Sequence, residues 1–383
     1  MFTKRQVLLG GIALMLATFF LTAAVFMSFF HLVSGDAVST VKFFSALRVV
    51  KARFIKDESV DKLMNGAIKG MIRSLDDPHS MYMDGEYFRQ FVVETEGQFG
   101  GIGIVVGVKD NMLTVVAPIE GTPSEAAGIK SGDRIIKIDG ESTLDMPLDI
   151  AVGKIRGQKD TFVEIVLLRS DGEEKTIKIM RTNIKLKSVA AEKLEDGMGY
   201  VRIRTFNEHT YEEFVQEMSK LDKEEVKGIV LDLRRNPGGL LESCVKVAEY
   251  FVPQGPVVSI TERTGKNDVL YSNNKKPKYK VVVLVDQGSA SASEIVAGAI
   301  QDTKAGTVIG ATTYGKGSVQ AILRLDSESA VKITIAKYYT PSGRAIDGVG
   351  VTPDIEVANT EWQDLQLIKA REVLRAELNE KSE

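Results

Sequence analysis

The sequence contains few of the residues that bind metal ions or form disulfide bonds. Among its 383 residues there are three histidines and one cysteine, Cys244. A single cysteine excludes an internal disulfide bond, and isolated histidines lack the spacing of a metal site, so we expect no metal or other cofactor. Cys244 falls on the apolar side of an expected helix over 240–251, which predicts an unreactive thiol in the core.

The chain also lacks an excess of charge of one sign. Its 49 lysines and arginines nearly balance its 52 aspartates and glutamates, which leaves a net charge of -3. This balance argues against nucleic acid as a partner. The length is sufficient for two or more domains with a sizeable core.

One long apolar segment is present at the N-terminus. Lys4 and Arg5 precede residues 7–33, whose apolar run is interrupted only by Gly, Thr, Ser and His31. A bilayer span needs about 20 residues, and a positive flank stays in the cytoplasm. We therefore expect residues 1–6 in the cytoplasm, an uncleaved single-pass anchor over 7–33 in the cell membrane, and an extracytoplasmic catalytic part of the bacterial type.

A serine follows an expected buried strand in the C-terminal half. The β-branched run 281–286 predicts the strand, and 294–300 has helical character, so Ser291 lies at a strand-to-helix turn. The amide of Ala292 would then point out of a helix N-terminus, where negative charge is stabilised. Taken alone, however, Ser291-x-x-Glu294 is more often a capping box, in which the two side chains bond to helix amides.

A lysine is predicted to lie near this serine. Residues 306–310 look like a second strand, and a right-handed crossover would bring Lys316 to the same sheet edge as Ser291. An ordinary lysine has a pKa of about 10.4, so a catalytic base here requires partial burial that lowers the pKa. Gln320 lies on the same face of an extended segment and could orient the amine. The alternative for Lys316 is a solvated loop residue.

Histidine is a less suitable base for Ser291. None of the three histidines accompanies the serine in sequence, although folding could bring His79 or His209 close to it. A Ser-His-Asp triad is therefore disfavoured. Upstream, 228–233 predicts another buried strand, followed by the turn Arg234-Arg-Asn-Pro-Gly-Gly239, so that three strand-to-helix loops share one edge.

Together these motifs resemble those of the C-terminal processing peptidases, also called tail-specific proteases. The resemblance covers about residues 40–357 and is carried by Leu231-Asp-Leu-Arg-Arg-Asn-Pro-Gly-Gly-Leu240, Gly288-Ser-Ala-Ser-Ala-Ser-Glu-Ile295, Thr313-Tyr-Gly-Lys-Gly-Ser-Val-Gln320 and Tyr338-Tyr-Thr-Pro-Ser-Gly-Arg344. It implies that Ser291 is the nucleophile, Lys316 the general base and Gln320 the residue that orients the base. It also implies an oxyanion hole formed by the amide of Ala292 with that of Gly238 or Gly239.

The preceding segment predicts a compact β-rich module. A glycine-rich strand over 99–104, a capped turn over 122–128 and a strand entering a tight turn over 132–140 resemble a PDZ domain spanning about 95–181. Residues 147–156 would form the helix beside its peptide groove. The resemblance implies that the amides of Gly101, Ile102 and Gly103 bind the terminal carboxylate of a peptide that adds a strand to the sheet. Alternatively, the glycines only permit a tight turn.

Arg156 is a candidate for coupling peptide binding to the catalytic part, since a guanidinium can bridge a carboxylate and backbone carbonyls. The alternative is an exposed arginine that complements the helix dipole. Helical periodicity over 35–94 and an amphipathic tail over 359–383 predict helical segments at both ends, which could cap the core or pair two protomers in a homodimer.

The sequence thus predicts an α/β catalytic core of the ClpP and crotonase type over 182–358, with an inserted PDZ domain. The expected function is a membrane-anchored serine endopeptidase whose substrates are proteins or peptides with free, nonpolar C-termini. One alternative is a catalytically inactive PDZ adaptor. Another is a crotonase-like acyl-CoA enzyme, against which the PDZ module and the apolar N-terminal segment argue.

Overall fold

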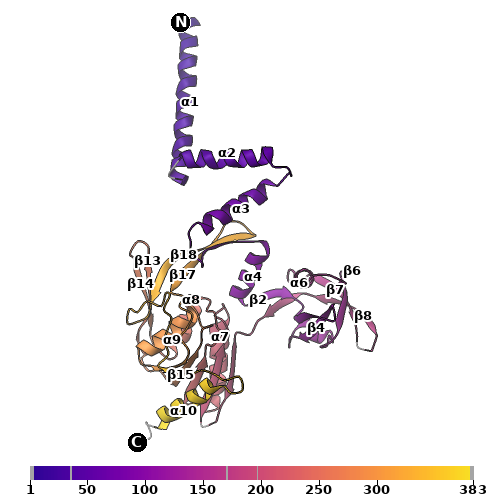
Figure 1. Cartoon of the computed structure of the whole chain (residues 1–383), viewed down its shortest axis with the longest axis vertical. Coiled ribbons are helices and arrows are strands. Elements are labelled where there is room, and N and C mark those ends of the chain that lie inside the picture. Colours follow the sequence, from indigo (N-terminus) through magenta and orange to yellow (C-terminus); the bar gives the residue numbers. More distant parts are fainter. Residues whose placement is uncertain (1–3, 35–36, 170, 196, 380–383) are drawn as a thin grey trace. The chain divides into compact units, whose positions relative to one another are not determined.

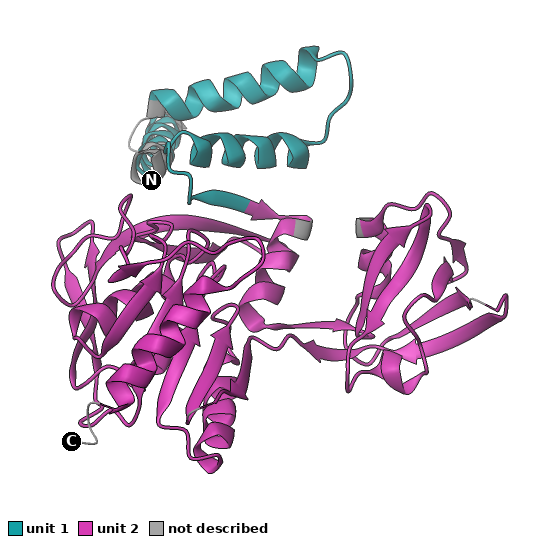
Figure 2. Ribbon diagram, turned by 60° about the horizontal axis from the view of Figure 1, so that its bottom comes forward, with its two compact units in different colours: residues 1–82 teal, residues 83–383 magenta. Residues whose placement is uncertain are grey.

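The computed structural model describes residues 4–34, 37–169, 171–195 and 197–379. It divides into two units, residues 1–82 and 83–383, coloured separately in Figure 2. Parts of five predicted segments lie outside the described residues: positions 1–3 of the segment expected in the cytoplasm, 35–36 of the expected N-terminal helical region, 170 of the expected PDZ domain, 196 of the expected catalytic core and 380–383 of the expected tail.

The first unit is helical. It contains α1 (Lys4–Ser34), α2 (Ala37–Arg53) and α3 (Val60–Arg73), and it ends within the short strand β1 (Met81–Asp84). Ser59 caps α3 by accepting a hydrogen bond from the amide of Lys62 at 3.1 Å. The hydroxyl of Tyr82 donates to Asn65 Oδ1 at 2.9 Å, which fixes the end of this unit against α3.

The predicted membrane anchor over 7–33 is wrong. These residues do form part of a helix, but α1 begins at Lys4 and so includes the two basic residues of the expected flank. Within the described ranges, no helix has both the length and the apolar character that a bilayer span of about 20 residues requires. The expected single-pass location in the cell membrane, with residues 1–6 in the cytoplasm and the catalytic part outside, depended on this anchor and is therefore also wrong.

A largely parallel sheet forms the centre of the second unit. Its strands lie in the order β10 (Val189–Lys193), β11 (Met198–Ile203), β12 (Gly228–Asp232), β15 (Lys280–Val285), β16 (Gly306–Gly310) and β19 (Ile355–Glu356). β10 runs antiparallel to β11, and the other pairs are parallel. Every residue of β12 is buried, as expected for a parallel strand covered on both faces.

Helices cover both faces of this sheet (Figure 1). α7 (Thr210–Lys223), α8 (Leu241–Glu249) and α9 (Ala292–Asp302) share one hydrophobic cluster with the sheet, whereas α10 (Leu365–Asn379) packs into a second cluster with Val230 and Val282. Cys244 of α8 is buried in the first cluster, and burial raises the pKa of its thiol. The prediction of a core thiol is confirmed.

Leu374 should contribute strongly to stability, because it is 0 % exposed and lies between α10 and the sheet. We expect Leu374→Ala to lower the free energy of unfolding by about 2–5 kcal/mol, measured by urea denaturation. Ile368→Ala is the control on the same helix: Ile368 is 54 % exposed, so its loss should cost only about 0.5 kcal/mol. Equal effects of the two substitutions would contradict the packing of α10 on this face.

Antiparallel strands form a second sheet in this unit. β18 (Ser329–Tyr339) pairs with both β13 (Gly255–Glu262) and β17 (Ser318–Arg324), and β14 (Asn267–Ser272) pairs with β13. α4 (Gly85–Glu96) packs on this sheet through a small cluster that contains Phe88, Ile322 and Ala330. α4 and the β17–β18 hairpin therefore form one wall near the ends of the parallel strands.

The β-rich module has a core of its own, as expected. Its sheet contains β3 (Ile104–Lys109), β4 (Met112–Pro118), β5 (Arg134–Ile138), β6 (Glu141–Ser142), β7 (Phe162–Leu168) and β8 (Glu174–Met180). Two helices accompany it, α5 (Pro123–Ala126) and α6 (Leu148–Ile155), and α6 is the helix predicted over 147–156. The antiparallel pair β2 (Gln98–Gly101) and β9 (Thr182–Lys185) flanks the module in sequence.

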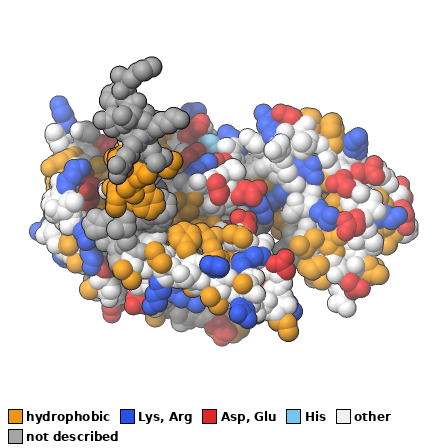
Figure 3. Space-filling view, turned by 90° about the horizontal axis from the view of Figure 1, so that it is seen from above, with side chains coloured by type: hydrophobic (Ala, Val, Ile, Leu, Met, Phe, Trp, Pro, Cys, Tyr) orange, Lys and Arg blue, Asp and Glu red, His pale blue; other side chains and the backbone are white. Residues whose placement is uncertain are grey.

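Charged side chains of both signs lie interspersed over the face seen in Figure 3, with hydrophobic side chains between them. An interspersed pattern of this kind produces little long-range attraction for a strongly charged polymer.

Candidate active site

Ser291 lies at the turn between β15 and α9. It directly precedes the helix and adopts φ 54° and ψ -113°, a conformation that residues with a side chain rarely occupy. Neighbouring hydrogen bonds hold this turn: Ser289 Oγ donates to the Leu233 carbonyl at 2.8 Å, and Ser293 Oγ donates to the Asn236 carbonyl at 3.0 Å. The strained backbone at Ser291 is typical of a functional position that the surrounding fold over-determines.

The turn at 234–239 lies directly against Ser291. A Cβ added to Gly238 would stand 2.8 Å from the Cβ of Ser291 and 2.9 Å from the amide nitrogen of Ala292, so only glycine fits there. The amide of Gly238 already donates to Asn236 Oδ1 at 2.9 Å. The amide of Gly239 has no acceptor among the described residues, and neither does that of Ala292. Of the two alternatives from the sequence, the geometry favours Gly239 as the second oxyanion donor.

Lys316 follows β16 in a tightly packed loop, and its side chain is half-buried, as the sequence predicts. The next residue, Gly317, approaches the backbone so closely that an added Cβ would stand 2.3 Å from the amide nitrogen of Asp347. The hydroxyl of Tyr338 donates to the carbonyl of Lys316. Burial raises the pKa of Tyr338, while the neighbouring Ser291 side chain acts in the opposite direction.

Glu294 joins the serine loop to the lysine loop. Its carboxylate is 0 % exposed, and one oxygen, Oε2, accepts the amide of Ser291 at 2.7 Å and that of Lys316 at 2.9 Å. The other oxygen, Oε1, accepts the hydroxyl of Thr313 at 2.6 Å and the amide of Gly315 at 2.7 Å. The capping-box interpretation anticipated only the bond to Ser291. The remaining three bonds connect residues about 20 positions apart, and the capping motif contains no signal for them.

Gln320 lies on β17, near Lys316. Its amide nitrogen donates to Ser318 Oγ at 2.8 Å and to Thr334 Oγ1 at 3.3 Å. These bonds hold the side chain on the face of the β17–β18 hairpin that borders the cavity next to Ser291. The predicted role of Gln320 in orienting the lysine amine stays a prediction.

One cavity of about 560 Å³ brings the predicted catalytic residues together. It is lined by all six residues assigned to the nucleophile, base, orienting group and oxyanion hole: Ser291, Ala292, Gly238, Gly239, Lys316 and Gln320. Apolar side chains, including Phe91 of α4 and Ile322 of β17, form another part of its wall. The cavity is large enough for several residues of an extended peptide.

The predicted carboxylate-binding loop of the module lies elsewhere. Gly101 ends β2, the side chain of Ile102 is fully buried, and Gly103 has φ 80°. The carbonyl of Gly103 accepts hydrogen bonds from Ser124 Oγ at 2.6 Å and Thr122 Oγ1 at 3.2 Å. These two hydroxyl groups fix the loop, a role that the sequence analysis did not anticipate.

Arg156 directly follows α6 as its C-terminal cap residue and is half-buried, so its position but not its exposure agrees with the alternative of an exposed arginine at the helix end. Its guanidinium lies over the ring of Phe99, 4.5 Å from the centroid. It also lines a cavity of about 570 Å³ whose other residues include Phe88 of α4 and Arg324 of β17. Arg156 therefore lies where the β-rich module faces α4 and β17, and it does not line the cavity that contains Ser291.

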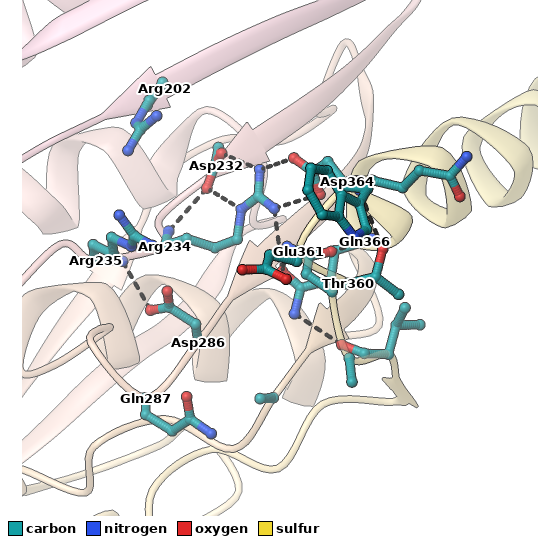
Figure 4. A pocket seen from close by; sticks show the side chains of 16 residues that line it. Arg202, Asp232, Arg234, Arg235, Asp286, Gln287, Thr360, Glu361, Asp364 and Gln366 are labelled. Atoms are coloured by element: carbon teal, nitrogen blue, oxygen red, sulfur yellow. Dashed lines mark hydrogen bonds and ion pairs between the residues drawn. The ribbon is translucent and has the colours of Figure 1, made fainter.

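An ion-pair network anchors the start of the 234–239 turn (Figure 4). Arg234 donates to Asp232 Oδ2 at 2.7 Å and to Asp364 Oδ1 at 2.7 Å, and Tyr200 donates to Asp232 from the adjacent strand. Asp364 immediately precedes α10, so the C-terminal segment is tied to the turn that contains Gly238 and Gly239. The sequence motif includes Arg234 but carries no signal for its distant partner.

Comparison with known proteins places these features in a family. The profile of Peptidase family S41 matches residues 197–357, a PDZ domain profile matches 114–169, and the profile described as the activating protease CtpB N-terminal domain matches 32–87. The PDZ match confirms the prediction for the β-rich module.

Curated relatives match over most of the chain. The carboxy-terminal-processing protease of Bartonella bacilliformis is 39% identical over 357 residues, which cover 88% of this chain and 82% of the relative. Carboxy-terminal processing protease CtpB of Bacillus subtilis is 37% identical over 340 residues, which cover 87% of this chain and 71% of the relative. Among solved structures, the photosystem II D1 C-terminal processing protease is 30% identical with a TM-score of 0.50, covering 89% of this chain and 92% of that chain.

The α/β core, the PDZ domain and the helices at both ends define a serine peptidase with a PDZ domain, which confirms the predicted fold class and enzyme class. The chain belongs to peptidase family S41 and, within it, to the carboxy-terminal processing proteases. This membership favours the peptidase over both the inactive adaptor and the acyl-CoA enzyme.

Proposed function

We propose that this protease cleaves its substrates by a Ser-Lys mechanism, with Ser291 as nucleophile, Lys316 as general base and Gln320 as the residue that orients the base. The observation that carries the proposal is the buried carboxylate of Glu294, which accepts the amides of both Ser291 and Lys316. A group of this kind fixes the spacing of the two loops before substrate binds, and such preorganisation is what a nucleophile and its base require.

The proposed steps follow from these positions. The neutral amine of Lys316 takes the proton of Ser291, whose oxygen attacks the scissile carbonyl carbon. The amides of Ala292 and Gly239 donate to the resulting oxyanion. The lysine then returns its proton to the leaving amine, and a water molecule, activated in the same way, hydrolyses the acyl-enzyme.

Substrate selection is proposed to reside in the PDZ domain. An extended peptide would add a strand to the domain, and the amides of Gly101, Ile102 and Gly103 would bind its terminal carboxylate. The bonds from Thr122 and Ser124 to the carbonyl of Gly103 support this role, because they hold the loop with its carbonyl turned inward. The substrates are then proteins or peptides with free, nonpolar C-termini.

The test uses the whole chain and an unstructured protein that ends in nonpolar residues. We expect degradation of the substrate with a free C-terminus, slower degradation when the terminus is amidated, and none with a Ser291→Ala variant. Mass spectrometry of the products identifies the cleaved bonds. Degradation by the Ser291→Ala variant would contradict the proposed nucleophile, and equal rates on the free and amidated substrates would contradict the PDZ role.

Arg156→Ala should reduce cleavage of intact substrates with a free C-terminus by about tenfold, if Arg156 couples the PDZ domain to the catalytic part. Labelling of Ser291 by a small fluorophosphonate should be unchanged, because the residue lies outside the catalytic cavity. Lys154→Ala is the matched control, since Lys154 is on the same helix and pairs with Glu141. Unchanged proteolysis in Arg156→Ala would exclude the coupling.

Homodimer formation through the N-terminal helices is part of the proposal. Apolar side chains are exposed on α2 and α3, among them Val41, Phe44 and Met71. Exposed apolar stripes of this kind are typical of surfaces that pair with another chain.

A further inference from the structure

The catalytic cavity contains a second lysine that the proposed mechanism does not use. Lys332 lies on β18 and pairs in register with Ile322 of β17, as Thr334 pairs with Gln320. Because side chains two residues apart share a face of a strand, Lys332 stands on the same wall as Gln320, further along the hairpin from Ser318. It lines the cavity together with Ser291 and Lys316.

The surroundings of Lys332 provide little compensation for its charge. Its side chain is half-buried, and Nζ lies 6.0 Å from the centroid of the Phe91 ring. Among the described residues, no ion pair and no hydrogen bond includes its ammonium group. Burial lowers the pKa of Lys332, and the charge of Glu94 acts in the opposite direction. Glu94 lines the same cavity from α4 but is itself exposed to solvent.

We infer that Lys332 binds a carboxylate group of the substrate and thereby makes the cavity selective for acidic groups at one position. The inference rests on the proposed peptidase function, since it concerns the same cavity. A partly desolvated ammonium that has no hydrogen bond or ion pair among the described residues gains most from an anion that brings a charge-assisted hydrogen bond. Phe91 and Ile322 provide apolar contacts for the methylene groups of a glutamate side chain.

Two kinds of carboxylate meet this description. One is the side chain of a glutamate or aspartate at a fixed distance from the scissile bond, and the other is the free C-terminus of the peptide. Glu94 should weaken the binding of either one, because it attracts the same ammonium. Removing the charge of Glu94 should therefore strengthen the preference for a substrate carboxylate. Removing the charge of Lys332 should abolish this preference.

The experiment is a positional scan with internally quenched peptides of neutral, nonpolar sequence that are amidated at the C-terminus, so that PDZ binding is suppressed. Each peptide carries one glutamate, moved from four residues before to four residues after the cleaved bond, and is compared with its glutamine counterpart. We expect a Glu:Gln ratio of kcat/KM of about ten at one position. In Lys332→Met this ratio should fall to about one, and in Glu94→Gln it should rise.

A second arm tests the free terminus. Short peptides with a free or an amidated C-terminus are compared in the unmodified protein and in Lys332→Met, so that the PDZ contribution cancels. Lys266→Met is the control, because Lys266 is 61% exposed and lies outside the cavity. The inference would be overturned if Lys332→Met left two ratios of kcat/KM unchanged: that of free to amidated peptides, and that of glutamate to glutamine peptides.

Peptide binding separates this inference from the proposed mechanism. The same peptides are titrated onto the Ser291→Ala variant by fluorescence anisotropy, with and without Lys332→Met. A glutamate preference in binding that depends on Lys332 supports the inference, whether or not the unmodified protein cleaves these peptides. Absence of cleavage by the unmodified protein would refute the proposed catalysis. Cleavage without any such preference refutes the inference and leaves the mechanism standing.

Discussion

Replacing Ser291 by alanine or Lys316 by methionine should each lower kcat/KM by about 10⁴- to 10⁶-fold, and the double variant should be no slower than the slower single variant. The reason is that the hydroxyl and the amine act as one unit. A serine that keeps its proton is a weak nucleophile, and an amine without a serine has nothing to activate. Residual cleavage would come from binding and the oxyanion hole alone.

The measurement is hydrolysis of an internally quenched peptide under single-turnover conditions. Ser243→Ala is the matched serine control, because the Ser243 hydroxyl is buried, lies outside the cavity and has no hydrogen-bond partner among the described residues. Lys266→Met is the matched lysine control. Additive losses in the double variant would show that Ser291 and Lys316 act independently and would refute the proposed pair.

Glu294→Gln should lower kcat by about 10²- to 10³-fold with little change in KM. Whichever way the new amide turns, its NH₂ group faces at least one backbone amide that now donates to a carboxylate oxygen. The two loops then move apart while the peptide-binding wall is retained. The free energy of unfolding should also fall by about 3 kcal/mol, because buried donors lose their acceptor.

Glu242→Gln is the control for this substitution. Glu242 is also in the first turn of a helix, but its side chain is 81% exposed and pairs with Lys246. We expect kcat and stability to change little in this variant. An undiminished kcat and an undiminished rate of Ser291 labelling by fluorophosphonate in Glu294→Gln would show that the carboxylate does not position the loops.

Local patterns were sufficient to predict the parts of the site that lie at the ends of strands. The buried runs at 228–233 and 281–286 correspond to β12 and β15, and the crossover through α9 leads to β16. Because parallel strands end at the same edge, the serine, the lysine and the glycine turn had to converge there. The helix over 147–156, which the resemblance to a PDZ domain implied, agrees with α6.

Contacts between distant residues were not predictable in this way. The bonds of Glu294 to the lysine loop and of Arg234 to Asp364 depend on how separate segments pack, and a single sequence contains no record of such pairs. The choice between Gly238 and Gly239 likewise needed the bond from Asn236. The membrane anchor was predicted from the apolar run and its positive flank and was wrong, because no helix in the described ranges meets the requirements of a bilayer span.

The backbone at Ser291 has a consequence for evolution and engineering. At φ 54° and ψ -113° a glycine would have a lower conformational energy than any residue with a Cβ, so the serine destabilises the fold at this position. A chain freed from the need to cut peptides would gain stability by giving up its nucleophile. Selection for thermal stability alone would therefore favour the replacement of Ser291 by glycine, which would remove the proposed nucleophile.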